Sequence, residues 1–415
     1  MGSTDVIVIG AGVLGLTAAV LLQQRLPFVS ITIISSELLA QSPLDSTHKF
    51  GMDLPSTSFA SAWAGAHYRP IPALTPSNPA YNQLSGAHQA FHSQLANEHR
   101  IAVRTAGYMK SIASSNPAAG VKVLQAAEYL ESPPPENLCL RSGDLYASPD
   151  DGFRVLEQAE LDTLNAKACS TGDSKPVKWA CEYETYTVNV HTYCQYLLRE
   201  FLDHGGKTIK QRLNSFADML ACLPSQQAEE AGQCAKAIIV NCSGLGLPSQ
   251  HDPATKIIRG QTVLVRQQFN KTLTRQCSNG TWSFLIPRPL GGGTIVGGTK
   301  QIGDEESNAR PEERRQLLAN AAKYFPEFVK DAKDFEVVQD NVGRRPWRKG
   351  GIRIEIDENA LDDSSKGVVV HGYGAGGRGY ELSWGTAEQI CVLVEKCLSR
   401  NEGRIAQEAA RLTKL

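Results

Sequence analysis

Residues 5–15 read DVIVIGAGVLG, and this stretch decides the fold. Its first half, Val6 to Ile9, is an apolar, β-branched run typical of a strand buried on both faces of a parallel sheet. A helical pattern covers Leu16 to Gln24, and between strand and helix stand three glycines in G-x-G-x-x-G spacing: Gly10, Gly12 and Gly15. Strand, glycine turn and helix in this order predict a dinucleotide site, with backbone close to a pyrophosphate at the helix N-terminus.

A second strand is expected from Phe28 to Ile34, where it would complete a βαβ unit with the first. An acidic residue near the end of such a strand binds a ribose hydroxyl, and Glu37, roughly two residues late, is the candidate. No arginine stands at the strand end to bind a 2′-phosphate, which argues against NADP. The motif alone leaves NAD and FAD open.

Length and composition set wide limits. With 415 residues the chain is long enough for two domains, and its 42 basic and 43 acidic side chains give no reason to expect nucleic acid or a membrane surface as partner. No apolar run reaches 18 residues, and a folded domain that starts at Asp5 argues against a signal peptide.

Ten cysteines are scattered along the chain without a C-x-x-C pair, which argues against a zinc site or a redox dithiol, so no metal ligands are assigned. Cys194, Cys391 and Cys397 fall in apolar helical patterns and are expected to be buried thiols. A single disulfide stays open. At the other end of the chain, Thr413-Lys414-Leu415 differs by one residue from the S-K-L peroxisomal signal, although a frayed helix end would look the same.

The middle of the chain predicts a different architecture from the opening unit. Helical patterns cover Tyr81 to Glu98, His191 to Phe201 and Pro311 to Phe325, whereas the Ser-, Ala- and Pro-rich residues Ser111 to Glu136 predict an irregular connection. Strands are expected in four segments, namely Ala235–Val240, Thr262–Arg266, Trp282–Ile286 and Thr294–Lys300. The antiparallel pattern of the later ones indicates a second domain.

A buried strand and a glycine-rich turn recur near the end of the chain, in residues 368–380, VVVHGYGAGGRGY, and the helical pattern from Glu381 to Cys397 follows. The strand expected at Ala235–Val240 ends in the small residues Asn241 to Gly246, which indicates a further close backbone approach to the nucleotide. The nucleotide domain is therefore expected to be assembled from segments distant in sequence.

These segments together resemble the D-amino-acid oxidase family, which includes the D-aspartate oxidases. The similarity covers nearly the whole chain in the family's order, fits least well between about Ser111 and Pro135, and selects FAD over NAD. It rests on eight stretches: residues 8–15 (VIGAGVLG), 63–66 (WAGA), 193–197 (YCQYL), 241–246 (NCSGLG), 259–261 (RGQ), 286–289 (IPRP), 341–346 (NVGRRP) and 371–374 (HGYG).

The resemblance implies an α/β fold in two interleaved domains. A Rossmann-type FAD-binding domain comprises residues 1–58, 186–255 and 341–415, and an α+β substrate domain built on a mainly antiparallel sheet comprises residues 59–185 and 256–340. The implied reaction is oxidation of a D-amino acid to the 2-oxo acid, with release of ammonia and hydrogen peroxide. It proceeds by hydride transfer from Cα to flavin N5, with oxygen as acceptor and no obligatory side-chain base, so no catalytic side chain is assigned.

The resemblance also implies a set of cofactor contacts in both halves of the chain. They are Gly10, Ala11, Gly12, Val13, Leu14, Gly15, Ser35, Ser36, Glu37, Ala64, Gly65, Ala66, Leu213, Ser243, Gly244, Gly374, Gly376, Gly377, Gly379 and Tyr380.

For the substrate, Arg345 matches the arginine that binds the α-carboxylate, and a guanidinium fork suits a carboxylate. Gly377 falls where a carbonyl accepts from the substrate amine. Phe284 replaces a carboxylate-binding tyrosine and cannot donate, so the contact is lost or another donor replaces it. Lys300 could bind the side-chain carboxylate of D-aspartate or D-glutamate, or reach into solvent. His67, Arg378 and Glu381 are expected at the pocket rim, where Arg378 would favour acidic substrates and an inward Glu381 would oppose them.

The sequence thus predicts a peroxisomal FAD-dependent D-amino-acid oxidase, since peroxide release makes the C-terminal signal and its import receptor credible. A narrower D-aspartate or D-glutamate oxidase that uses Lys300 is the first alternative. A flavin-bound protein without oxidase activity and an NAD-dependent dehydrogenase are the others. The preferred substrate stays open, as does the assembly, for which a homodimer is one candidate.

Overall fold

The computed structural model describes six stretches of the chain, and the statements below concern these residues. They are residues 5–39, 55–144, 151–168, 175–222, 237–360 and 367–412. The C-terminal tripeptide of the predicted peroxisomal signal lies outside them. No helix in these stretches is long and apolar enough to cross a lipid bilayer.

The chain forms two compact units, each built from segments that are distant in sequence. Unit 1 comprises Met1–Gln41, Cys194–Lys256 and Pro346–Leu415, and unit 2 comprises Ser42–Tyr193 and Ile257–Arg345. The first change of unit falls after residue 41, where the predicted domain boundary was 58, and the others fall after 193, 256 and 345, where 185, 255 and 340 were predicted. These compact units do not test which residues form the FAD-binding and substrate domains, so the predicted boundaries of those domains stay predictions.

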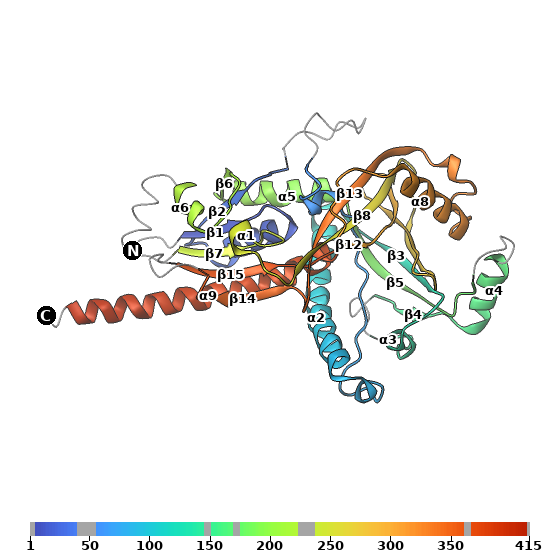
Figure 1. Cartoon of the computed structure of the whole chain (residues 1–415), viewed down its shortest axis with the longest axis horizontal. Helices are drawn as coiled ribbons and strands as arrows, with labels where there is room; N and C mark the ends of the chain where they lie inside the picture. The colour runs from blue at the N-terminus through green and yellow to red at the C-terminus, as the bar shows by residue number, and fades with distance from the viewer. Residues whose placement is uncertain are drawn as a thin grey trace. The chain divides into compact units, whose positions relative to one another are not determined.

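Unit 1 is built on a six-stranded sheet in the order β14-β15-β7-β1-β2-β6 (Figure 1). Its neighbours pair in parallel except for the edge strand β14, which is antiparallel to β15. The strands are β1 (Asp5–Ile9), β2 (Ser30–Ser35), β6 (Lys207–Lys210), β7 (Ala237–Asn241), β14 (Arg353–Asp357) and β15 (Gly367–Tyr373).

Both faces of this sheet are covered, as the β-branched run in β1 predicts. Ile7 and Ile9 pack into a core cluster with Phe216 and Met219, while Val6 and Val8, which point to the opposite face, are fully buried as well. The long helices α1 and α9 pack against each other along the sheet. The helices of this unit are α1 (Val13–Arg25), α6 (Ala217–Cys222), η5 (Pro248–Gln250) and α9 (Gly379–Leu412), and α5 (Val190–Asp203) enters it from unit 2.

Unit 2 is built on a nine-stranded, mainly antiparallel sheet in the order β12-β8-β11-β10-β9-β3-β5-β4, with β13 paired to β8. Only β3 and β9 pair in parallel along this path. The strands are β3 (Val121–Leu130), β4 (Arg154–Val155), β5 (Trp179–Val188), β8 (Thr255–Val265), β9 (Lys271–Gln276), β10 (Trp282–Pro287), β11 (Thr294–Gly297), β12 (Gln301–Ile302) and β13 (Val337–Arg348). The predicted fold class, an α/β Rossmann-type unit with an α+β unit, is confirmed.

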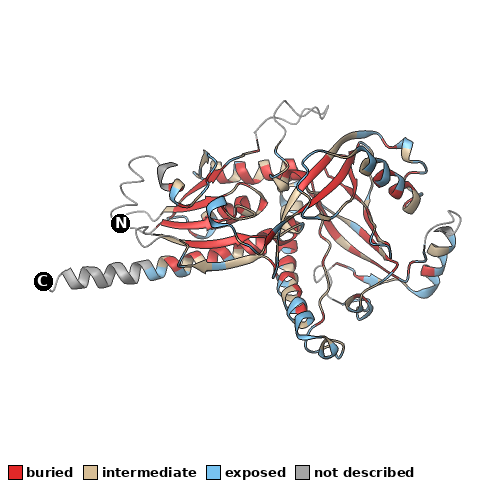
Figure 2. Ribbon diagram, in the orientation of Figure 1, coloured by how far each residue is buried: buried red, intermediate tan, exposed pale blue. Residues whose placement is uncertain are grey.

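The alternation of side chains gives the unit 2 sheet two different faces. On one face Val263, Leu285 and Val296 pack with Leu317 and Ala321 of helix α8 (Pro311–Tyr324), which begins with a proline as predicted. The other face carries the intervening residues, among them Phe284 and Gly297, and is the one that concerns the candidate site. Figure 2 shows the central strands of both sheets almost wholly buried.

The prediction of an irregular connection from Ser111 to Glu136 is wrong. Helix α2 (Gly86–Ser115) runs far beyond the predicted end at Glu98, because Ile101, Ala102 and Met109 continue its buried face. Residues 121–130 then form β3, which is held by pairing to β5 on one side and β9 on the other. Pairing on both edges stabilises this strand although its alanines have a low β-propensity.

The remaining helical segments of unit 2 are short and lie around the sheet. They are η1 (Ala60–Trp63), η2 (Tyr81–Gln83), η3 (Pro117–Ala119), α3 (Pro135–Leu138), α4 (Gln158–Ala168) and η6 (Ala332–Asp334).

Candidate active site

In unit 1 the predicted dinucleotide site forms where parallel strands end side by side. The turn after β1 is fixed to its neighbours, because the Gly10 N–H donates to the carbonyl of Ile34 and the Cys242 N–H donates to the carbonyl of Ile9, both at 2.9 Å. The turns after β1, β2, β7 and β15 therefore gather at the carboxyl edge of the sheet, which is where open α/β sheets bind ligands.

The glycines of the first turn are required by close backbone contacts. Gly10 has a φ of +99°, and a Cβ there would lie 2.6 Å from the Cys242 carbonyl oxygen, while a Cβ on Gly15 would collide with the Gly10 carbonyl. Helix α1 begins at Val13, its N-cap Gly12 provides no side-chain cap, and its first turn carries no acidic residue. The N-cap residue thus leaves the helix N-terminus uncapped by its own side chain and without a nearby acidic residue on the first turn, an arrangement that suits a pyrophosphate.

A second helix N-terminus lies beside the first. The turn after β15 holds Gly374 and Gly376 at φ of +89° and +60°, and helix α9 then begins at Gly379. A Cβ on Gly379 would lie 3.3 Å from Cγ1 of Val13, so the starts of α9 and α1 are adjacent. The glycine turn predicted near the end of the chain therefore reaches the same edge as the opening turn, and the edge fits the diphosphate of FAD.

Other predicted cofactor residues of unit 1 lie around this edge, and some already have partners within the protein. The Ser35 hydroxyl accepts from the Ala11 N–H and donates to the Glu37 carbonyl, so it braces the turn. The Tyr380 hydroxyl lies 3.2 Å from Cys194 Sγ in a buried hydrogen bond. Leu213 packs into the core cluster of β1 and β2.

The Ala64–Ala66 segment belongs to unit 2, where it lies against the sheet. The Arg288 guanidinium donates to the Ala64 carbonyl at 2.8 Å, and a Cβ on Gly65 would lie 2.9 Å from Cδ1 of Ile286. The small residues noted in the sequence thus let this segment approach the sheet closely.

The substrate site predicted in unit 2 centres on Arg345 of β13. Its guanidinium lies over the backbone of Gly260 on β8, so closely that any Cβ at residue 260 would collide with it. Nη1 donates to the Thr299 carbonyl at 3.1 Å, and among the described residues no carboxylate forms an ion pair with this cation. Burial lowers the pKa of Arg345, although an arginine stays protonated. A half-buried cation without a counter-ion among the described residues is suited to bind an anion.

The surface beside Arg345 is mostly apolar. Thr262, Gly297 and Phe284 stand opposite one another on three adjacent strands and share the face on which Gly260 meets the guanidinium. Gly297 leaves room for the Phe284 ring, because a Cβ there would collide with it. Next along this face comes a cluster that Phe284 joins, formed by Leu264, Ile286 and Ile295.

Thr262 is a residue that sequence reasoning missed. Its hydroxyl is buried and has no hydrogen-bond partner among the described protein atoms, on the same face as the Phe284 ring. A threonine that alternates with buried apolar residues in a strand gives no functional signal, so only the position of its strand neighbours indicates that it lies at the site.

Lys300 directly follows Thr299, whose carbonyl binds Arg345, in the short link between β11 and β12. It is exposed, and no ion pair to it is found in the described part of the chain. The structure therefore places a second cation one residue from the Thr299 carbonyl. The exposure of Lys300 is compatible with both predicted roles, binding of a side-chain carboxylate and extension into solvent.

Two of the predicted rim residues, His67 and Arg378, contribute no free positive charge. Burial, with a smaller contribution from the Arg69 cation, lowers the pKa of His67 to about 3, so this imidazole is neutral at neutral pH. Arg378 Nε binds Oε2 of Glu381 at 2.8 Å on the first turn of α9. Glu381 thus neutralises Arg378, so the pair would add no net positive charge for acidic substrates, and the place of both residues at the pocket rim stays a prediction.

The described cysteines are free thiols, and Cys194, Cys391 and Cys397 are buried as predicted. Burial raises the pKa of both Cys194 and Cys391 to about 12, which leaves them uncharged. In the described stretches no group of three His, Cys, Asp or Glu side chains could hold a metal ion.

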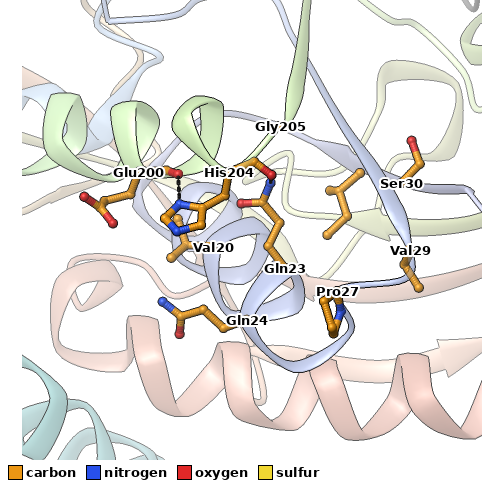
Figure 3. Close-up of a pocket in the computed structure, with 10 residues that line it drawn as sticks. Val20, Gln23, Gln24, Pro27, Val29, Ser30, Glu200, His204 and Gly205 are labelled. Carbon is orange, nitrogen blue, oxygen red and sulfur yellow. Dashed lines mark hydrogen bonds between the residues drawn. The ribbon is translucent and has the colours of Figure 1, made fainter.

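One pocket of unit 1 lies away from the glycine turns (Figure 3). It is lined by the C-terminal part of α1, the start of β2 and the end of α5, where the His204 ring lies 2.7 Å from the Glu200 carbonyl. This is the amino edge of the parallel strands, opposite to the edge that binds dinucleotides in such sheets. The pocket is thus not part of the candidate active site.

Comparisons with known proteins agree with this fold. Residues 5–393 match the family model described as "DAO: FAD dependent oxidoreductase", so the chain belongs to this family of FAD-dependent oxidoreductases. Within it, the chain is 44% identical over 395 residues to a D-aspartate oxidase of Talaromyces thermophilus, covering 94% of both chains. It is 28% identical to a D-amino-acid oxidase of Fusarium vanettenii, covering 95% of this chain and 97% of that one.

Solved structures support the fold at lower sequence identity. A glycine oxidase of Bacillus cereus superposes with a TM-score of 0.61 at 14% identity, covering 95% of each chain. An L-alpha-glycerophosphate oxidase of Mycoplasma pneumoniae with FAD bound gives 0.58 at 13%, again with 95% of each chain. The predicted family and the predicted cofactor, FAD, are confirmed.

Proposed function

We propose that the protein is an oxidase of D-amino acids. Substrate, oxygen and water would give the 2-oxo acid, ammonia and hydrogen peroxide, so that two electrons leave the Cα–N unit and reduce one oxygen molecule. Arg345 carries this proposal, because a cation without a counter-ion over a glycine suits an α-carboxylate. Two relatives, a D-aspartate oxidase and a D-amino-acid oxidase, support the substrate class.

FAD, held at the glycine turns after β1 and β15, would supply the hydride acceptor and the two-electron route to oxygen. This chain's residues bind and orient the substrate. Arg345 fixes the α-carboxylate with charge-assisted hydrogen bonds, and the apolar face around Phe284 and Ile286 excludes water from it. Holding the reactants in one geometry is a large part of such catalysis, and no side-chain base is required in the proposed reaction.

A narrower specificity for D-aspartate or D-glutamate is the second candidate. Lys300 supports it, since an exposed lysine next to Thr299 could bind a side-chain carboxylate while Arg345 binds the α-carboxylate. The 44% identity to a D-aspartate oxidase favours the same specificity. His67 and Arg378 add no free positive charge, so Lys300 is the side chain on which this candidate depends.

The deciding experiment is peroxide release by the FAD-loaded protein with D- and L-forms of aspartate, glutamate, alanine, methionine and lysine. Activity on D-aspartate and D-glutamate alone would support the narrow specificity. Activity on neutral D-amino acids as well would support the broad one. A yellow, FAD-loaded protein that releases no peroxide with any D-amino acid would contradict the proposal and favour a flavin-bound protein without oxidase activity.

We further propose that the enzyme acts in the peroxisome, where its peroxide would be destroyed. The support is Thr413-Lys414-Leu415, which resembles the S-K-L signal that an import receptor binds. A fluorescent protein that ends in the last ten residues of this chain should enter peroxisomes, and the same fusion without the tripeptide should not. Cytosolic fluorescence from both fusions would contradict the proposal.

A further inference from the structure

We propose that Thr299 positions Arg345 for carboxylate binding, and that a buried ion pair between Arg259 and Glu313 holds Thr299 in place. The inference rests on the proposed function in one respect, namely that Arg345 binds a carboxylate. Thr299 itself would not touch the substrate: it would act through the orientation of the guanidinium.

The contact between Thr299 and Arg345 is a backbone contact, so the position of the Thr299 peptide decides where the guanidinium lies. Its carbonyl accepts the one hydrogen bond that the Arg345 side chain forms with the described residues, from Nη1 at 3.1 Å. The backbone of Gly260 packs against one face of the guanidinium. A shift of the Thr299 carbonyl would therefore turn the guanidinium fork away from its binding geometry, since no other polar contact from the described part of the chain opposes the movement.

The Thr299 side chain fixes that peptide to the neighbouring strand. Its hydroxyl accepts from the Gln261 N–H at 2.7 Å, while the Thr299 N–H donates to the Gln261 carbonyl at 3.0 Å. The hydroxyl also lies 3.4 Å from Oε1 of Gln301. The Thr299 hydroxyl thus takes the place of a strand carbonyl as acceptor for the Gln261 N–H. These bonds keep the segment after β11 in register with β8.

The partners of Thr299 are themselves held by a buried charge cluster. Arg259, whose side chain is fully buried, donates to Gln301 Oε1 at 2.7 Å, to Glu313 Oε2 at 2.8 Å and to Gln261 Oε1 at 3.1 Å. Gln301 Nε2 also donates to Glu313. Arg259 therefore connects the two glutamines that bind Thr299 to the start of helix α8, which anchors the loop that carries Lys300 as well.

The test is Thr299→Val, which keeps the shape of the side chain and the backbone carbonyl but removes the hydroxyl. With D-alanine and D-aspartate we expect KM to rise about fivefold, the effect of losing one buried hydrogen bond, with kcat nearly unchanged. Thr299→Ser should restore the wild-type KM. The matched control is Ser283→Ala, a buried hydroxyl without a protein partner on the α8 side of the sheet, which should leave KM unchanged.

Binding of a carboxylate that cannot be oxidised separates this inference from the proposed reaction. Succinate binding to the FAD-loaded protein, measured by calorimetry, should be lost in Arg345→Ala and weakened about fivefold in Thr299→Val, even if the enzyme oxidises no D-amino acid. A folded Thr299→Val protein with a lower Tm but unchanged KM and succinate affinity would overturn the inference and leave a purely structural threonine. If Thr299→Val does not fold, Thr299→Ala, which also removes the hydroxyl, takes its place in the same measurements, and an unchanged KM and succinate affinity in that variant would likewise overturn the inference.

Discussion

Arg259 and Arg345 stand on adjacent strands of one sheet, yet the protein treats their charges in opposite ways. Arg259 donates to one carboxylate, two glutamine side chains and the carbonyls of Glu306 and Asn308. Arg345 donates to a single carbonyl and has no counter-ion among the described residues. The comparison shows that a half-buried arginine is a candidate ligand-binding residue when the surrounding protein leaves its charge and its donors unsatisfied.

The largest effect should come from removing the satisfied arginine. Arg259→Ala would leave Glu313 with Arg310 as its remaining cation and would remove the Arg259 donor from Gln261 and Gln301, so we expect a loss of up to about 3–5 kcal/mol of unfolding free energy, the range for breaking a buried ion pair. Urea denaturation of the FAD-loaded variant should show a clearly lower midpoint. A midpoint equal to that of the wild type would mean that the charge cluster is not a structural element, and the contrast with Arg345 would fail.

Arg345→Ala should instead keep the stability and lose the function. We expect kcat/KM for D-amino acids to fall at least about 30-fold, equivalent to about 2 kcal/mol for loss of a buried charge contact in the complex. The unfolding midpoint should stay at or above the wild-type value, because a desolvated, unpaired cation is removed. Normal kcat/KM would contradict the assignment of Arg345 to the substrate carboxylate.

Lys300 tests whether a second unpaired cation contributes to specificity. Lys300→Met should lower kcat/KM for D-aspartate roughly two- to fivefold, the range for an exposed ion pair, while D-alanine oxidation is unaffected. Lys300→Arg, which keeps the charge, serves as the control and should retain most of the D-aspartate activity. Equal losses on both substrates would indicate a lysine that extends into solvent.

Phe284→Tyr should give the smallest effect. A phenolic hydroxyl on the face that carries Arg345 would add a donor for the α-carboxylate and lower KM a few-fold, as one further hydrogen bond does. If KM for D-alanine rises instead, a donor already present near Phe284 has been displaced, and Thr262, with its unpartnered hydroxyl, is the first residue to substitute.

The elements with strong local signals could be predicted from the sequence. The glycines of the first turn predicted the βαβ unit because only glycine allows the observed contacts of Gly10 and Gly15. Strand β3 was missed because two alanines and a polar flank give no strand pattern, and pairing on both edges decides its structure instead.

At the site, motif position predicted Arg345 but not its environment. Its neighbour Arg344 pairs with Glu305, 39 residues away, while Arg345 does not, and no sequence pattern separates the two. Thr299 was missed because its hydroxyl binds a backbone 38 residues distant. By contrast, the pairing of Arg378 with Glu381 follows the i, i+3 rule for helices and could have been predicted.

The contact between Gly260 and the Arg345 guanidinium couples the evolution of two positions that are 85 residues apart. A side chain at 260 would occupy the volume of the Arg345 fork, so the guanidinium would have to leave its observed position if residue 260 gained a Cβ. Related chains that keep the arginine should keep the glycine, and a chain in which residue 260 has acquired a Cβ should have abandoned carboxylate binding at this place. Glycine at position 260 is therefore expected to mark the members of the family that bind a carboxylate at this arginine.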